Sequence, residues 1–225
     1  MASPVRQDRL PTTIFYWNLC TLSTLYDLAR KVAPSLDFLS ETRLAGGRAE
    51  RINFQSAEGI LWRFTGFYGN PKAHLRSFSS DLLRRLKSLN LLPWLYRGDF
   101  NKVLILSEKI VGGDRSVTSI VNFRKAIVDC DLNDLGFSGF LVTWNNKQES
   151  TSNIQERLDR FIGSSSWQSL FPWAHVEHGE FFQSDHCPII VHLVSRLGGK
   201  AERGDFAQSS KSFKFESFWL KEDTC

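Results

Sequence analysis

Acidic and amide side chains recur at the ends of short apolar runs in this sequence. The set comprises Asn18, Glu41, Asp99, Asn101, Asp185 and His186. Loops beyond strand ends gather functional residues because the strands fix their geometry. Carboxylate and amide oxygens suit Mg²⁺ or Mn²⁺, and a nearby histidine suits proton transfer or stabilisation of a phosphate. We therefore expect metal-assisted hydrolysis of a phosphodiester, in which the ion neutralises the phosphate and a carboxylate aligns the attacking water.

Each residue also has a plainer structural interpretation. The tetrapeptide at 98–101 could be a turn in which Gly98 supplies the backbone dihedrals. Glu41 could be a solvated or capping carboxylate, and residues 185–188 could be a polar turn that enters a strand. Asp159 could form a surface ion pair with a neighbouring arginine. Only the order and combination of these residues favour a catalytic site.

The elements that must position these residues alternate along the chain. We expect strands at residues 14–17, 36–39, 60–68, 94–96, 140–144, 158–162 and 189–194. We expect helices at residues 25–32, 72–90 and 120–130. In the last of these helices, Phe123 and Ile127 should lie on the inner face. Strands interleaved with helices indicate an α/β or α+β layered domain.

The helix expected at 72–90 has an apolar face and a basic group. Its apolar side chains recur at helical spacing and make one face. They are Leu75, Phe78, Leu82, Leu86 and Leu89. Arg84, Arg85 and Lys87 fall largely off that face. These three residues could bind nucleic-acid phosphates, or they could form a solvated helix face, as charge runs usually do.

The bulk composition is that of a globular protein. The 225 residues are 42% hydrophobic and 23% charged, with a formal net charge of +4. So small a positive excess is compatible with a polyanionic partner but does not demonstrate one. The four cysteines form no CxxC pair, which excludes a zinc knuckle and favours free thiols. We see no signal-like segment and no apolar run of membrane-spanning length, so we expect an intracellular protein.

An ordered set of short motifs resembles the endonuclease/exonuclease/phosphatase superfamily. The motifs are Trp17-Asn18, Ser40-Glu41-Thr42, Phe67-Tyr68-Gly69, Gly98-Asp99-Phe100-Asn101, Thr143-Trp144, Arg157-Leu158-Asp159-Arg160 and Ser184-Asp185-His186. Residues 62–69, 132–137 and 156–160 look most like the apurinic/apyrimidinic-type endonuclease domain of plant LINE-type (non-LTR) retrotransposons. The resemblance implies a DNase I-like fold, in which two mixed β-sheets pack as a sandwich with helices on the outside, in four layers. We expect this domain at residues 14–194 and a flexible C-terminal tail at 195–225.

The resemblance implies a set of metal ligands. Glu41 would be the principal ligand, supported by Asn18 and Asp185. The cofactor would be Mg²⁺ or Mn²⁺, and the partner would be DNA, which would place the protein in the nucleus. No obligate protein partner is inferred.

The resemblance also implies the catalytic roles. Asp99 would orient or deprotonate the attacking water, while Asn101 and Tyr68 would contact the phosphate. His186, paired with Asp159, would stabilise the charged transition state. A carboxylate behind a histidine fixes its tautomer and favours the imidazolium, which can donate to a phosphate oxygen.

Two departures separate this chain from the family pattern. The stretch at 17–22 reads WNLCTL and lacks the family's Arg-Gly. Only 20 residues lie between Glu41 and Trp62, where family members carry a few tens more, including central strands. We therefore expect some strands to be missing and their neighbours to have unpaired backbone groups. The chain would be a degenerate fragment or lack an exon; the alternative is a compact variant that closes the sheet differently.

Three functions remain open at this point. The first is a metal-dependent endonuclease that nicks DNA. The second keeps the fold and the chemistry but acts on a phosphodiester in a lipid or an RNA. The third is a non-catalytic remnant with at most weak nucleic-acid binding. Metal dependence separates the first two from the third, and substrate choice separates the first from the second.

Overall fold

The fold is seen in a computed structural model that describes residues 13–18, 36–40, 49–56, 59–89, 91–182 and 184–193. The strands are β1 (Thr13–Asn18), β2 (Leu36–Ser40), β3 (Ala49–Gln55), β4 (Leu61–Tyr68), β5 (Trp94–Asp99), β6 (Lys109–Ile110), β7 (Leu132–Asp134), β8 (Trp144–Asn145), β9 (Gln155–Glu156), β10 (Asp159–Ser164), β11 (His175–His178) and β12 (Ile189–His192). The α-helices are α2 (Arg76–Ser88), α3 (Val117–Asp129) and α4 (Ser165–Leu170). Short 3₁₀ turns are η1 (Ala73–Leu75), η2 (Leu106–Glu108) and η3 (Ser150–Ser152).

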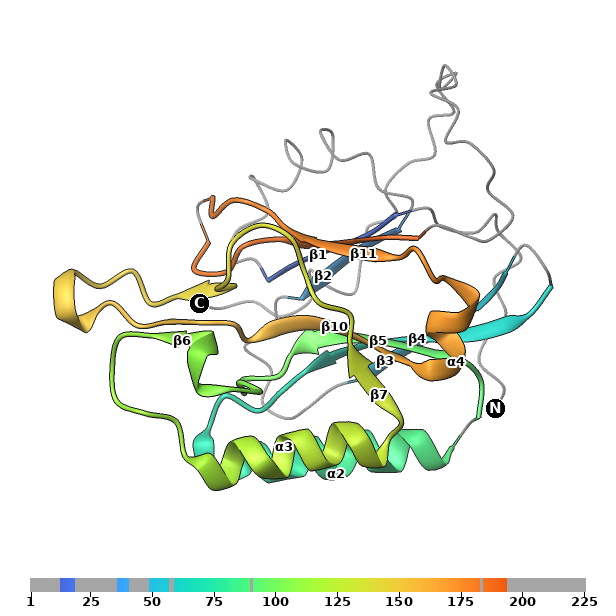
Figure 1. The fold of residues 1–225 in the computed structure, drawn as a ribbon, viewed down its shortest axis with the longest axis horizontal. Coiled ribbons are helices and arrows are strands. Elements are labelled where there is room, and N and C mark those ends of the chain that lie inside the picture. The colour runs from blue at the N-terminus through green and yellow to red at the C-terminus, as the bar shows by residue number, and fades with distance from the viewer. Residues whose placement is uncertain are drawn as a thin grey trace, which may run out of the picture.

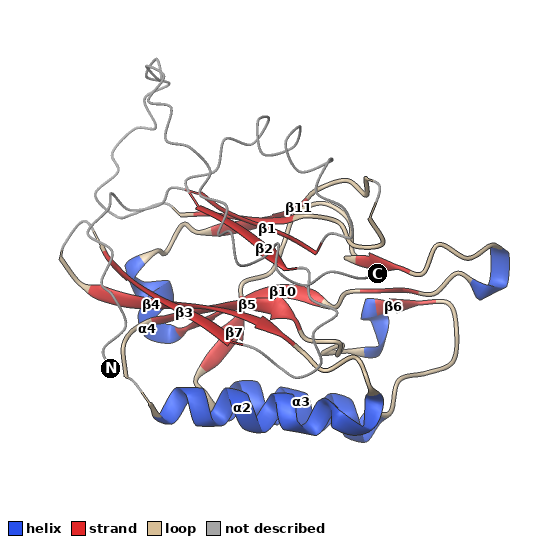
Figure 2. Ribbon diagram, turned by 180° about the vertical axis from the view of Figure 1, so that it is seen from behind, coloured by secondary structure: helices blue, strands red, loops and turns tan. Residues whose placement is uncertain are grey.

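Two β-sheets are stacked face to face, and both have mixed strand directions (Figure 1). One sheet has the order β3-β4-β5-β10-β7, and the other has the order β11-β12-β1-β2. A small third sheet, β6-β9-β8, lies at one end. Helices α2 and α3 run side by side over the outer face of the five-stranded sheet, as the view from behind also shows (Figure 2). The predicted sandwich of two mixed sheets is confirmed, whereas the helix expected at 25–32 lies outside the described residues.

The five-stranded sheet packs against a buried apolar cluster on each face. Alternation along β4 directs Trp62 and Phe64 towards the four-stranded sheet, where they join Ile189 and Val191 in one buried cluster. Side chains of opposite parity pack against the helices instead. This second cluster contains Phe67, Trp94, Tyr96, Leu83, Phe123, Ala126 and Ile127. Its members confirm the predicted inner face of the 120–130 helix, and the two clusters together hold three layers in place.

Helix α2 buries only part of the predicted face. Leu86 is buried and Leu82 packs against the second cluster, as predicted, but Phe78 and Leu89 are 64% and 60% exposed. Ser79 and Ser80 are buried instead. The buried hydroxyls have hydrogen-bond partners. The backbone N–H of Asn70, for example, donates to Ser79 Oγ at 3.2 Å. A buried hydroxyl with a partner costs little, so the polar positions can face inwards while the aromatic ring remains outside.

The strand expected at 140–144 is also largely absent. Only Trp144 at its end enters a strand, β8, while Phe140 and Leu141 are exposed in the loop before it. The expected run at 94–96 is longer than predicted, because β5 continues to Asp99. Every helix in the described part of the chain is too short or too polar to span a bilayer.

The short segment after Glu41 still supplies a strand. Strand β3 pairs antiparallel with β4 along its length, from Ala49 opposite Phe67 to Gln55 opposite Leu61. Because β5 pairs with the other side of β4, the backbone of β4 is bonded on both edges. Strand β4, beside the shortened segment, therefore lacks the unpaired backbone groups that we expected for the neighbouring strands. Within the described residues, the edge strands of the two large sheets are β3, β7, β11 and β2.

Candidate active site

Three neighbouring strands bring three of the predicted site residues side by side. Strands β4 and β5 are parallel, and their register places Tyr68 opposite Asp99. Strand β10 is antiparallel to β5 and places Asp159 opposite Asp99 on its other side. The last residue of two strands and the first residue of a third thus meet at one edge of the sheet. The hydrogen-bonded ladder fixes the spacing of these side chains.

Asn101 is held against Asp99 by a left-handed backbone. Its φ is 52°, and its backbone N–H donates to Asp99 Oδ1 at 2.7 Å. Its side-chain amide donates to the Gly69 carbonyl oxygen at 3.0 Å. Asparagine adopts this conformation more readily than most residues because its side chain bonds locally. The loop after β5 therefore has a single well-defined shape beside the carboxylate.

Gly98 does not supply the dihedrals of a turn, as the plainer interpretation had it. It lies inside β5 rather than in a turn, opposite Phe67 of β4. A Cβ built there would overlap the carbonyl oxygen of Phe67, so only glycine allows the two strands this approach. The Gly-Asp-Phe-Asn motif is therefore a strand end followed by the Asn101 loop.

His186 reaches this edge from the segment that precedes β12. Its Nδ1 lies 2.7 Å from Asp159 Oδ2, and both side chains are buried. The hydroxyl of Thr143 accepts from the backbone N–H of Asp159 at 2.9 Å, which fixes this end of β10. A bridge between Trp144 and His186 ties the segment to β8. The pair thus joins the two stacked sheets at the site.

The plainer interpretation of Asp159 as a surface ion pair is wrong. Its arginine neighbours bond elsewhere: Arg157 pairs with Glu108 at 3.0 Å, and Arg160 pairs with Asp134 at 2.9 Å. These four side chains form an ion-pair network beneath the site. Asp159 itself is fully buried and pairs with the histidine instead.

The electrostatics of the pair favour a charged histidine. Burial by itself would lower the pKa of His186, but the charge and hydrogen bond of Asp159 raise it to about 9. Burial would likewise raise the pKa of Asp159, but the histidine holds it below its usual value. Burial and the charge of Asp159 raise the pKa of Asp99 above its usual value. Burial, followed by the charges of Asp99 and Asp159, raises the pKa of Tyr68 to about 12.

The carboxylates at this edge fit a divalent cation. Asp99, Asp159 and His186 offer ligand atoms that all lie within 4.8 Å of one another. Asp159 Oδ1 is buried and has no hydrogen-bond partner among the described atoms. A protonated imidazole cannot ligate a metal, so the oxygen atoms are the relevant donors. Such oxygen donors are the kind that Mg²⁺ and Mn²⁺ prefer.

The predicted metal ligands are placed only in part. Asp185 Oδ2 accepts from Trp144 Nε1 at 3.0 Å, which orients that carboxylate next to His186. Asn18 ends β1, which runs antiparallel to β12, so its backbone lies near the start of β12. Asn18 also pairs with Ser40, the residue before Glu41. Glu41 itself lies outside the described residues, and its role stays a prediction.

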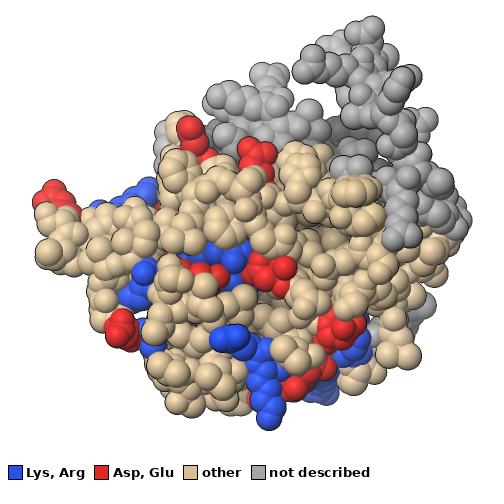
Figure 3. Space-filling view, in the orientation of Figure 1, with Lys and Arg blue, Asp and Glu red and all other residues tan. Residues whose placement is uncertain are grey.

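The predicted nucleic-acid contacts do not act as one group. Arg84 pairs with Asp81 at 3.2 Å and with Asp129 at 2.9 Å, so two carboxylates offset its charge. Arg85 is exposed, and Lys87 is partly buried. Figure 3 shows basic and acidic side chains intermixed over the part of the surface that α2 and α3 form. Binding of DNA by these residues stays a prediction.

Two supporting residues carried no predicted role. Thr143 and Trp144 are adjacent in the sequence, yet the first bonds the backbone of β10 and the second bonds Asp185. The Thr143-Trp144 motif was visible in the sequence, but the partners lie at least 15 residues away along the chain. Spacing alone could not pair them. Gly69 is a third case, since its carbonyl oxygen accepts from the Asn101 side chain.

This arrangement is the architecture of DNase I-like proteins, and the solved structures that share it have the endonuclease/exonuclease/phosphatase fold. One is the endonuclease domain of TRAS1, a telomere-specific non-LTR retrotransposon, with a TM-score of 0.57 and 16% identity. The match covers 84% of this chain and 100% of that domain. No protein-family model and no curated protein sequence matches the chain.

Two further solved structures have the same fold. The 3′-5′ exonuclease NExo from Neisseria meningitidis matches with a TM-score of 0.58 and 14% identity, over 80% of this chain and 99% of its own. TDP2 from Caenorhabditis elegans matches with a TM-score of 0.51 and 14% identity, over 82% of this chain and 75% of its own. Identities this low establish the shared fold and leave the activity of this chain to be argued from its site.

Proposed function

We propose that this chain is a divalent-metal-dependent phosphodiesterase that nicks DNA. The observation that carries the proposal is the buried, hydrogen-bonded pair of His186 and Asp159 beside Asp99 at the end of β5. A base, a cationic hydrogen-bond donor and further carboxylates at one sheet edge are the groups that phosphodiester hydrolysis requires. A similar fold in the TRAS1 endonuclease domain supports a nuclease and, more narrowly, an origin in a retrotransposon.

The pKa directions support the proton-transfer roles that we propose. Asp99, whose pKa is raised, is the base that orients and deprotonates the attacking water. Because its pKa is raised to about 9, His186 is a positively charged imidazolium at neutral pH. It therefore donates a hydrogen bond to a phosphate oxygen and stabilises the negative charge of the transition state. Asp159 holds the imidazolium, and Asn101 and Tyr68 position the phosphate.

Metal ligands complete the proposed site. Glu41, Asn18 and Asp185 would hold Mg²⁺ or Mn²⁺, which when bound supplies charge neutralisation at the phosphate. The Trp144 indole, which donates to Asp185, keeps that carboxylate turned towards the site.

DNA is the substrate that we propose for this site. A second structure of the Neisseria phosphatase NExo, with a TM-score of 0.55, is described as bound to a product DNA hairpin. That complex shows that a protein of this fold can bind DNA. The proposal carries this substrate over to the present chain.

The test is conversion of supercoiled plasmid to nicked circle in Mg²⁺, with and without a chelator. His186→Ala should lower the rate by at least about a hundredfold, the low end for a positioned acid–base group. His175→Ala is the matched control, because His175 is exposed on β11 and away from the site. Equal background rates of nicking by the parent, His186→Ala and His175→Ala would refute the proposal. Metal- and His186-dependent cleavage of RNA or a lipid phosphodiester, but not of DNA, would retain the chemistry and replace the substrate.

A further inference from the structure

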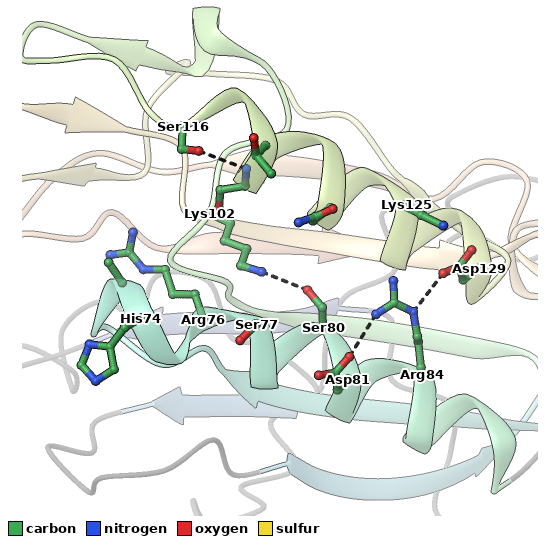
Figure 4. A pocket seen from close by; sticks show the side chains of 14 residues that line it. His74, Arg76, Ser77, Ser80, Asp81, Arg84, Lys102, Ser116, Lys125 and Asp129 are labelled. Atoms are coloured by element: carbon green, nitrogen blue, oxygen red, sulfur yellow. Dashed lines mark hydrogen bonds and ion pairs between the residues drawn. The ribbon is translucent and has the colours of Figure 1, made fainter.

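A cavity of about 660 Å³ lies between α2 and α3, on the opposite side of the five-stranded sheet from the sandwich core. Figure 4 shows cationic and hydroxyl side chains turned into it from both helices and from the segment after β5. The residues that line it include Arg76, Ser77, Ser80, Arg84, Lys102, Ser116, Thr118, Ser119, Asn122 and Lys125. Only two acidic residues, Asp81 and Asp129, lie among the lining side chains.

Lys102 is the buried member of this group. It follows Asn101, and its side chain extends into the cavity towards Ser80 (Figure 4). It is 6% exposed, and its Nζ donates to Ser80 Oγ at 2.9 Å. Its ammonium also lies 5.4 Å from the centre of the Phe123 ring. Within the described part of the chain, no carboxylate forms an ion pair with it. A buried ammonium without a counter-charge is uncommon and costly.

The acidic residues of the cavity already form ion pairs. Asp81 and Asp129 both pair with Arg84, which also lines the cavity. Arg76 donates to the carbonyl oxygen of Pro71, and its Nε is buried with no hydrogen-bond partner among the described atoms. Lys125, from α3, forms no ion pair with any described residue. The cavity therefore holds an excess of positive charge and hydrogen-bond donors that no acidic side chain in the described chain satisfies.

Lys102 behaves as a cation that is short of a partner. Burial, followed by the nearby charge of Arg76, lowers its pKa to about 8. An anion bound in the cavity would raise the pKa of Lys102 again. It would accept hydrogen bonds from the buried ammonium and offset the repulsion by the guanidinium of Arg76. Several donors arranged around an open volume suit a tetrahedral oxyanion, which accepts on three or four oxygens at once.

We propose that this cavity binds a phosphate group, with Lys102 as its buried charged donor and Arg76, Lys125 and the serine hydroxyls around it. The phosphate could belong to a nucleic-acid strand or be free in solution, and both offer the same oxygens. If it belongs to a strand, the inference rests on the proposed function; if it is free, the inference stands alone. The site is separate from the sheet edge that carries Asp99 and His186.

The first measurement is a calorimetric titration of the full chain with inorganic phosphate. Lys102→Met removes the charge but keeps an apolar stem against Phe123, and it should weaken binding by at least about tenfold, as loss of one charged hydrogen bond does. Lys125 is exposed, so Lys125→Gln tests the cavity without risk to the core. This variant should bind phosphate several-fold more weakly than the parent. Arg124→Gln, an exposed α3 residue outside the cavity, is the control and should bind as the parent does.

The second measurement separates the two sources of phosphate. Binding of a labelled DNA oligonucleotide is followed by fluorescence anisotropy at several salt concentrations, for the parent and Lys102→Met. A strand phosphate predicts weaker binding by the variant, a smaller salt dependence, and competition by inorganic phosphate. A free phosphate predicts weaker phosphate binding with unchanged oligonucleotide binding.

Failure of this inference is distinguishable from failure of the proposed function. The phosphate titration is repeated on His186→Ala, which lacks the proposed catalytic donor but retains every lining residue of the cavity. Undiminished phosphate binding there, with loss of binding in Lys102→Met, supports the cavity whether or not plasmid is nicked. If phosphate does not bind the parent, or binds Lys102→Met and Lys125→Gln as tightly as the parent, the inference is overturned.

Discussion

The imidazole of His186 is subject to two opposed influences. Burial disfavours its charged form, while the carboxylate of Asp159 stabilises that form through a short hydrogen bond. The carboxylate prevails, and the ring is an imidazolium at neutral pH. This state suits a hydrogen-bond donor to a phosphate oxygen and does not suit a general base.

Asp159→Asn should reverse that balance. Without the carboxylate, burial remains, so the pKa of His186 should fall from about 9 towards or below its ordinary value of 6.5. NMR titration of the imidazole measures it directly. A ring that still titrates near the parent value would show that another group holds its charge. Any nicking at neutral pH should fall together with the fraction of charged ring.

The same pair makes a contribution to stability that depends on pH. A histidine whose pKa is raised by folding stabilises the native state fully below 6.5, and that contribution is lost as the pH rises through about 9. The free energy of unfolding of the parent should therefore decline across this window. Denaturant melts of Asp159→Asn should show a flatter profile there. A parallel decline in both proteins would contradict the assignment.

Among the elements, β5 depends on one glycine for its fit against β4. Gly98→Ala would place a Cβ onto the Phe67 carbonyl oxygen, in backbone that cannot give way easily. We expect a loss of about 1–3 kcal/mol or more in urea melts, as for overpacked interiors. Gly113→Ala is the matched control, since nothing lies within 4 Å of a Cβ there. Equal stability of the two variants would show that β5 can shift.

The sequence predicted the elements whose apolar pattern had one interpretation. β4, β5 and α3 follow their hydrophobic spacing, and β4 ends at Tyr68 as expected. The buried face of α2 was predicted only in part, because Ser79 and Ser80 are buried through hydrogen bonds that hydrophobic spacing does not record. The register between strands was equally invisible to a sequence pattern.

The site was predictable in its residue types but only partly in its partnerships. His186 and Asp159 lie 27 residues apart, one in the segment before β12 and the other in β10, so only the resemblance to a family paired them. The support that Thr143 gives to β10 depends on tertiary contacts that no spacing encodes. The cavity lysine was missed for a similar reason: Lys102 stands directly after a motif, but its contacts with Ser80 and Phe123 are tertiary.

At the scale of the whole molecule, one buried histidine makes the fold sensitive to acid. His178 stacks on Phe137, and its Nδ1 lies 2.6 Å from the carbonyl oxygen of Phe140. Burial lowers its pKa to about 4, and its Nε2 has no hydrogen-bond partner among the described atoms. A second proton on the ring would therefore be buried without an acceptor.

Acidification below about pH 6.5 should consequently destabilise the protein. A histidine with a depressed pKa stabilises the fold above 6.5, and this contribution is lost as the pH falls from 6.5 through about 4. The loss should reach a few kcal/mol at most, at about 1.4 kcal/mol per pKa unit. His178→Gln should flatten unfolding free energies over this range, whereas exposed His175→Gln should not. Burial raises the pKa values of Glu108 and Asp134, but their ion pairs with buried arginines outweigh it and lower both values. The contribution of these two carboxylates to the free energy of unfolding is therefore lost at lower pH still.

The bond between His186 and Asp159 crosses from one stacked sheet to the other, and this has a consequence for folding. A partly folded chain could form the five-stranded sheet with its helices and still be catalytically silent, because its histidine would arrive only with the second sheet. Turnover would then serve as a reporter of sheet docking that is independent of secondary structure. In graded denaturant, loss of activity should track the fluorescence of Trp62, which is buried between the sheets, and precede the loss of helical circular dichroism if docking fails first.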